Sequence, residues 1–233
     1  MNKTSDWGEM VKAQGDIWLR LIVFIIGLLV MSFGIDLFIV SNLGATPWDT
    51  LHVGLYEHFG LTIGSWSIIV GFFVLGTSAL FLKEWPKFGA YLNMILCGVF
   101  IDLFLKLPFM VTPDTLTGKI IMFLAGLLIN GYGMGIYISA KLGAGPRDSF
   151  MLAVQQKTGW KVSHVRRGME VIVLTAGFLL GGPVHIGTIL YCIIIGTIVG
   201  FALPECQWLT NKVLRKMGSR KHNNKEIKRG VSL

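Results

Sequence analysis

Two short segments, one in each half of the chain, carry acidic residues that could serve a shared binding site. Leu43–Thr50 reads LGATPWDT and Leu142–Ser149 reads LGAGPRDS, so both follow the pattern LGAxPxD[ST]. Glycine permits a break after a helix, proline suits the first residue of a new helix, and an aspartate in the first turn complements the helix dipole. We therefore expect Asp49 and Asp148 to begin two short helices. They serve there either as caps alone or as caps that also face a cavity.

The candidate binding residues gather around these two breaks. Broken helices expose free backbone groups, which are tolerated at membrane depth only where protein or a water-filled cavity surrounds them. Arg147 is expected to contact an anionic substrate on the cytoplasmic face. Asp36 is the candidate for proton coupling, because ionisable residues inside spans are functional candidates by default, and its alternative role is a bond to a neighbouring helix. The predicted substrate-binding residues are Asp36, Gly44, Pro47, Asp49, Asn130, Gly143, Pro146, Arg147 and Asp148.

Metal and enzyme chemistry have weaker support in the sequence. Asp49 and His52 share a helical face and Glu57 and His58 follow, but the second motif has Met151 in the place of His52. There is also no zinc-protease, nucleophile-elbow or P-loop pattern. We therefore expect no metal, no cofactor and no catalytic activity.

Long apolar blocks must position these residues. Hydrophobic residues make up 53% of the 233 and charged residues only 15%, against about a quarter charged in a soluble domain. A helix needs roughly 20 apolar residues to cross a bilayer, and no block shows the alternation of a strand. The chain is therefore predicted to be an all-α polytopic membrane protein. Its six predicted spans are Ile17–Val40, Ile63–Leu82, Phe88–Leu107, Ile120–Ala140, Val165–Leu180 and Ile186–Leu203.

The net charge of +8 is explained by membrane orientation rather than by nucleic-acid binding. With six spans, 19 of the 21 Lys and Arg residues fall on one side of the membrane. Membrane proteins keep such residues in cytoplasmic loops. We therefore predict cytoplasmic N- and C-termini in the bacterial cytoplasmic membrane, with no nucleic-acid partner.

The doubled motif belongs to an internal repeat. Gly34 aligns with Gly133 ahead of the motifs, and Gly89 aligns with Gly187 after them. Because each half holds three spans, the second half must be inverted relative to the first, an arrangement typical of secondary transporters. The expected divisions are a cytoplasmic N-terminus at 1–16, a first repeat at 17–109, a linker at 110–118, a second repeat at 119–204 and a basic cytoplasmic tail at 205–233, flexible after Gly218.

Several other residues in or near the spans are expected to serve packing or local pairing. Asp102 is expected to pair with Lys106 one turn on, and Glu170 with Arg166 or Arg167. Glycines in transmembrane helices commonly permit close helix packing. This reading applies to Gly131, Gly133, Gly135, Gly196 and Gly200.

On its two LGAxPxD[ST] segments, the glycines ahead of them and its six-span layout, the chain resembles the YczE/YyaS/YitT group of bacterial integral membrane proteins. The YczE-like branch is the most similar. The resemblance implies a membrane protein with an expected role in transport, and it implies no particular substrate. The leading hypothesis is a small secondary transporter or exporter. The alternatives are a membrane scaffold or maturation partner of a biosynthetic enzyme, and the substrate-binding subunit of a multi-subunit importer.

Overall fold

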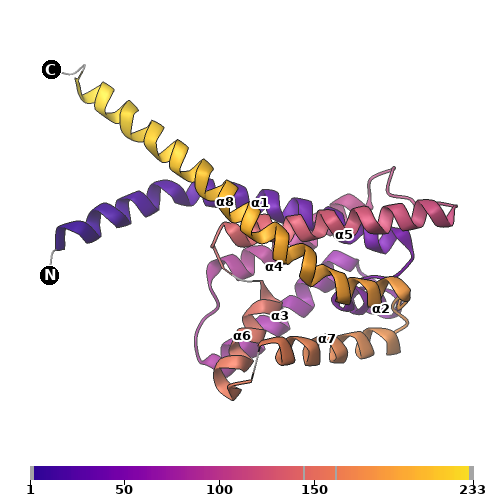
Figure 1. The fold of residues 1–233 in the computed structure, drawn as a ribbon. Coiled ribbons are helices and arrows are strands. Elements are labelled where there is room, and N and C mark those ends of the chain that lie inside the picture. Colours follow the sequence, from indigo (N-terminus) through magenta and orange to yellow (C-terminus); the bar gives the residue numbers. More distant parts are fainter. Residues whose placement is uncertain (1–2, 144, 161, 231–233) are drawn as a thin grey trace.

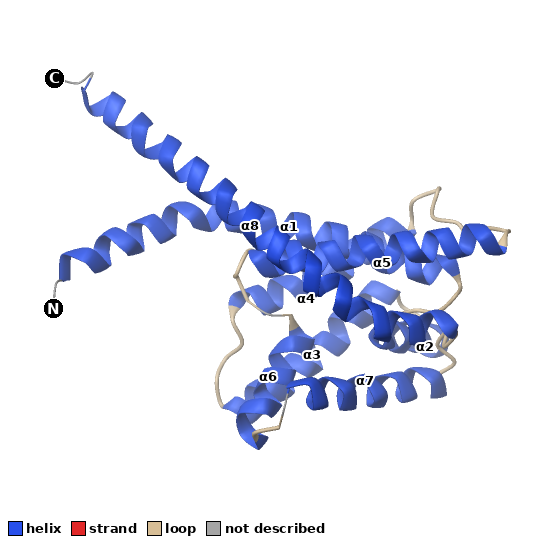
Figure 2. Cartoon of the chain, in the orientation of Figure 1, coloured by secondary structure: helices blue, strands red, loops and turns tan. Residues whose placement is uncertain are grey.

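The computed structural model describes residues 3–143, 145–160 and 162–230, and the side chains of 17–143, 145–151, 153–160 and 164–214. Within these ranges every regular element is a helix (Figure 2). The helices are α1 (Lys3–Ser41), α2 (Pro47–Phe59), α3 (Ile63–Leu82), α4 (Phe88–Leu105), α5 (Leu116–Ser139), α6 (Pro146–Thr158), α7 (Val162–Leu179) and α8 (Ile186–Gly230).

Five of these helices are long and apolar enough to cross a membrane. They are Ile17–Ser41 of α1, α3, α4, α5 and Ile186–Leu214 of α8. The predicted sixth span corresponds to α7, whose 18 residues include Arg166, Arg167 and Glu170. These charges lower the mean hydropathy of α7, so α7 is not among the five helices that are apolar enough to cross a membrane.

The two motifs build the same local structure twice. Gly44 and Gly143 adopt φ angles of 130° and 144°, a conformation that favours glycine and ends the preceding long helix. The next helices, α2 and α6, begin at Pro47 and Pro146, and each is 13 residues long. Proline loses no hydrogen bond at this position. The predicted helix starts are therefore confirmed.

Helices α1 and α5 cross in antiparallel directions at the centre of the fold. Successive close contacts join Gly27 to Tyr137, Met31 to Gly133 and Gly34 to Asn130. Residue numbers thus rise along α1 as they fall along α5. A Cβ atom on Gly133 would lie 2.3 Å from the backbone nitrogen of Met31, so glycine is required for this approach.

The glycine expectation holds on α5 but not on α8. Gly131 packs against Ile198, and Gly135 packs against Ala202 and Cys206. Around the Cβ positions of Gly196 and Gly200, by contrast, no described atom lies within 4 Å. These two glycines face away from the bundle, and the prediction that they pack inside it was wrong.

Each short helix packs against the other half of the chain. Helix α2 packs on α7 and α6 packs on α3, and Figure 1 places α2 and α6 toward opposite ends of the long helices. The first residues of α8 and α4 pack against the chain breaks after α1 and α5, respectively, through equivalent glycines. The Gly187 N–H donates a hydrogen bond to the Leu43 carbonyl at 2.9 Å, and Gly89 lies against the Leu142 carbonyl.

Helix α8 extends beyond the expected end of the second repeat. It runs through Pro204 and the proposed boundary at 205 and continues to Gly230. The part of the tail that was expected to be flexible after Gly218 is thus helical as far as Gly230. Lys and Arg, which are common in this segment, are good helix formers.

Candidate functional site

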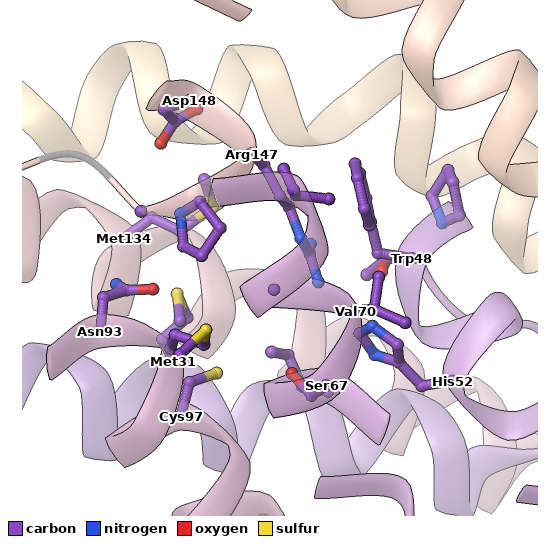
Figure 3. A pocket seen from close by; sticks show the side chains of 18 of the residues that line it. Met31, Trp48, His52, Ser67, Val70, Asn93, Cys97, Met134, Arg147 and Asp148 are labelled. Carbon is purple, nitrogen blue, oxygen red and sulfur yellow. The ribbon is translucent and has the colours of Figure 1, made fainter. Parts of the chain in front are cut away.

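A cavity of about 110 Å³ lies where the starts of α2 and α6 approach each other. Each water site needs roughly 10–15 Å³ by this measure, so the cavity has room for several waters or a small solute. Five of the predicted binding residues line it (Figure 3). They are Pro47, Asn130, Pro146, Arg147 and Asp148.

The N-terminus of α2 is capped by a side chain of the same motif. The Asp49 N–H donates a hydrogen bond to Thr46 Oγ1 at 3.2 Å, and the Thr46 hydroxyl donates in turn to Asp49 Oδ2. His52 Nδ1 lies 3.7 Å from Asp49 Oδ1. Asp49 is fully buried. The side chain that caps α2 is therefore Thr46, whose hydroxyl contacts the Asp49 carboxylate, and the same carboxylate also faces a cation.

That cation is Arg147, which reaches across from the second motif. Its Nη2 lies 3.6 Å from Asp49 Oδ1, and its guanidinium stands over the Trp48 ring at 4.9 Å from the ring centroid. Arg147 and Trp48 occupy the same position in the two motifs. A close charge-assisted hydrogen bond would measure about 2.7–2.9 Å. The pair with Asp49 is therefore loose, and it joins the two halves across the cavity.

The start of α6 differs from the start of α2. Its N-cap is Gly145, where α2 has Thr46, so α6 has no side-chain cap. The Asp148 carboxylate accepts a hydrogen bond from the Tyr137 hydroxyl at 3.3 Å instead. The two equivalent aspartates therefore have different partners, and only α2 has a side-chain hydroxyl, that of Thr46, as its cap.

The remaining predicted residues lie behind the cavity wall. Asp36 is fully buried in α1, and neither carboxylate oxygen has a hydrogen-bond partner among the described residues. Gly44 packs so closely on α8 that a Cβ would lie 2.6 Å from the Thr188 nitrogen. Gly143 packs near Gly89. The two motif glycines thus shape the breaks without lining the cavity.

Sequence reasoning missed several polar side chains of the cavity wall, among them Ser67, Asn93, Tyr137 and Tyr191. Asn93 of α4 is 6% exposed, and its Nδ2 has no hydrogen-bond partner in the described part of the chain. An amide inside an otherwise apolar block was a signal that could have identified it. Tyr137 aligns with Phe38 in the repeat, so its hydroxyl is a polar addition to the second half only.

Two ion pairs expected from local spacing have different outcomes. Arg166 Nε lies 3.0 Å from Glu170 Oε1, which confirms that pair. Asp102 does not pair with Lys106 as expected. Its carboxylate accepts hydrogen bonds from the Thr62 hydroxyl at 2.5 Å and from the Gly64 N–H at 2.9 Å. It therefore stabilises the N-terminus of α3, where free N–H groups attract an anion.

The fold and the site define a polytopic α-helical membrane protein with a small cavity, lined by apolar and polar side chains, between two helix breaks. The chain belongs to the "Family of unknown function (DUF6198)", whose model matches residues 18–204. This confirms the resemblance inferred from the motifs.

Individual relatives agree with this family assignment. The chain is 49% identical over 195 residues to "Uncharacterized membrane protein YczE" of Bacillus subtilis (strain 168), covering 83% of this chain and 89% of the relative. It is 33% identical over 181 residues to an "Uncharacterized protein" of Haemophilus influenzae, covering 78% and 82%. It is 31% identical over 180 residues to "Uncharacterized protein YyaS" of B. subtilis, covering 77% and 90%. No solved structure matches the chain significantly.

Proposed function

We propose that this protein is a secondary transporter or exporter of a small molecule in the bacterial cytoplasmic membrane, without catalytic activity. The observation that carries the proposal is the meeting of α2 and α6 at one cavity. Each helix starts at a break after a long helix, and each comes from a different half of the chain. Substrate sites of secondary transporters are commonly built from such discontinuous helices at the interface of two repeats.

Inverted repeats are part of this proposal. Along the α1–α5 crossing, each contact has a counterpart when equivalent residues of the two halves are exchanged. The contact of Gly133 with Met31 corresponds to that of Gly34 with Asn130. The short helices follow the same pattern. Helix α2 packs on α7 of the second half, and its equivalent α6 packs on α3 of the first half. Antiparallel packing of equivalent helices supports a two-fold relation with its axis in the membrane plane.

The proposal includes α7 as a sixth span, with both termini in the cytoplasm. Its 18 residues extend about 27 Å at 1.5 Å per residue, close to the roughly 30 Å hydrocarbon core. Beyond Glu170 its side chains include exposed apolar residues such as Ile172 and Phe178, which suit contact with lipid. Six spans also preserve the separation of 19 basic residues from two, which supports the orientation.

In the proposed mechanism, the contact of Arg147 with Trp48 and Asp49 keeps the cavity closed. It holds the starts of α2 and α6 together across the cavity. Because the ion pair is loose, a substrate can compete for Arg147, and release of the contact would let the two short helices move apart. Opening toward one end and then the other is alternating access. Asp36, which is buried and has no hydrogen-bond partner among the residues that the structure describes, is the proposed proton-coupling group.

The direct test is flux in proteoliposomes that contain the full-length protein. A panel of small organic anions, cations and neutral solutes is offered with and without a proton gradient. We expect at least one solute to move in a gradient-dependent way, and an Asp49→Asn/Asp148→Asn double variant to lose most of that flux. Asp114→Asn, an exposed acid outside the site, is the matched control and is expected to keep it. Absence of flux, or full flux in the double variant, would contradict the proposal.

One observation favours the scaffold alternative. Helix α8 continues past its membrane-spanning part to Gly230, and its final segment is rich in Lys and Arg. A long basic helix on the cytoplasmic side could bind an acidic surface on a soluble enzyme. Truncation after Leu214 separates the two functions, because a transporter should retain flux whereas a scaffold should lose its co-purifying enzyme.

A further inference from the structure

We infer that the cavity binds a small monovalent oxyanion of carboxylate type at the N-terminus of α6. The inference rests on the proposed transport function and narrows its substrate class. The site comprises the start of α6, the Arg147 guanidinium and the Asn93 amide, all of which line the cavity (Figure 3).

The first line of support is the difference between the two helix starts. In α2 the Asp49 N–H is occupied by Thr46 Oγ1. In α6 glycine replaces that threonine, so no side chain caps the Arg147 and Asp148 N–H groups. Uncapped N–H groups at a helix start, together with the helix dipole, favour an anion. The N-terminus of the short helix is thus capped by a side chain in the first half and uncapped in the second half.

The second line of support is the state of Arg147. A guanidinium has five N–H donors in a planar fork that matches a carboxylate. Among the described residues Arg147 has one loose ion pair, at 3.6 Å from Asp49, and a stacking contact with Trp48. The hydrogen bonds found in the described chain include none from its side chain. The Arg147 side chain is 37% exposed and lines the cavity, so it has donors available for a ligand.

The third line of support is Asn93, which points to a ligand independently of the helix start. The side chain is 6% exposed, and its Nδ2 has no hydrogen-bond partner among the described residues. It lies next to the open cap, because a Cβ on Gly145 would be 2.9 Å from Asn93 Oδ1. A buried amide without partners costs free energy unless a ligand or water satisfies it.

Charge and size select a small monovalent ligand. Arg166 also lines the cavity, but its ion pair with Glu170 at 3.0 Å is closer than that of Arg147 with Asp49 at 3.6 Å, so Arg147 is the less neutralised of the two guanidinium groups. Asp148 stands in the first turn of α6 and would repel a multiply charged anion. The cavity of about 110 Å³, which has room for several waters, accommodates a small carboxylate. Acetate and formate are therefore suitable probes.

Binding is measured by thermal unfolding of the full-length protein in nanodiscs, independently of transport. Acetate is compared with acetamide, its neutral isostere, at an ionic strength held constant with chloride, which is not an oxyanion. We expect a saturable rise in Tm of about 3–6 °C at ten times Kd for acetate and none for acetamide. An equal rise with both probes, or no rise with acetate, would overturn the inference.

Two variants locate the site. Gly145→Ser restores the type of cap that Thr46 provides in α2, and the φ of −62° at Gly145 is open to any residue. The new Cβ would lie 2.9 Å from Asn93 Oδ1, so the Asn93 side chain must shift, and the variant should fold yet weaken acetate binding at least tenfold. Arg147→Gln should do the same by removing the charge. The control is Gly76→Ala, whose Cβ meets no described atom within 4 Å, and it should bind as the wild type does.

The two proposals fail in different ways. Acetate binding that survives unchanged in a folded Gly145→Ser protein would overturn the anion site. If acetate does not bind but gradient-driven flux of a neutral or cationic solute is found, the anion site is wrong and the transport function stands. If acetate binds as expected but no solute crosses the membrane, the site stands and the transport function is wrong.

Discussion

Replacement of Gly133 by alanine should destabilise the protein by separating its two central helices. The new Cβ would lie 2.3 Å from the nitrogen and 2.6 Å from the Cα of Met31, both backbone atoms that cannot rotate away. Carbon contacts are optimal at about 3.5–4.0 Å, so α1 and α5 must move apart by about 1 Å. A gap of that size forfeits roughly a quarter to a half of each dispersion contact along the crossing.

The expected cost follows from these terms. Overpacking of a close interface costs about 1–3 kcal/mol, and the gain from removing a helical glycine offsets about 1 kcal/mol. We therefore expect a net loss of about 1 kcal/mol, or a Tm lower by roughly 2–4 °C for a chain of this size. Gly34→Ala should lose a similar amount, because its Cβ would lie 2.5 Å from the Asn130 nitrogen.

Gly196→Ala is the matched control, since it changes the same residue type in another membrane helix. Its Cβ would meet no described atom within 4 Å, so Tm should stay constant or rise by about 2–4 °C through helix propensity. The assay is intrinsic fluorescence of detergent-purified protein at one scan rate. A Gly133→Ala protein as stable as the wild type, or a Gly196→Ala protein equally damaged, would refute the assignment of the α1–α5 interface.

Three further predictions concern helix starts and buried carboxylates. Thr46→Ala should lower stability by about 1 kcal/mol through loss of the α2 cap, whereas Thr46→Ser should retain it; equal Tm values for the two variants would contradict the capping role. Asp102→Ala should lower Tm more than Lys106→Ala, because Asp102 bonds to the start of α3; equal effects in thermal unfolding would argue for the pair between them. Asp36→Asn should leave Tm unchanged or raised, since the carboxylate has no hydrogen-bond partner within the described part of the chain, and should abolish the dependence of flux on a proton gradient. Flux that stays gradient-dependent would remove Asp36 from that role.

The local structure of the motifs could be predicted from sequence because its causes are local. The positive φ at Gly44 and the helix start at Pro47 follow from the residues themselves, as does the bond from Asp49 to Thr46. The repeat extended each of the backbone predictions to the second half. The two motifs differ at Gly145, which stands where the first motif has Thr46, so the missing cap of α6 was visible in the sequence.

The contacts between distant segments could not be predicted in the same way. Glycines on an apolar helix do not show which face meets a helix and which meets lipid, so Gly133 and Gly196 looked alike. Spacing also favoured Lys106 as the partner of Asp102, although the start of α3, distant in sequence, provides the better donors. Arg147 approaches Asp49 because α2 packs on the second half of the chain and α6 packs on the first half. No local sequence pattern encodes this packing.

The central claim is that the cavity between α2 and α6 opens in turn to each side of the membrane. Ser67 lines this cavity (Figure 3), so Ser67→Cys in a protein whose three native cysteines are replaced by alanine reports access without knowledge of the substrate. A membrane-impermeant maleimide is applied to right-side-out and to inside-out vesicles. Alternating access predicts labelling of Cys at position 67 in both preparations. Labelling from one face alone, or from neither, would contradict the transport mechanism.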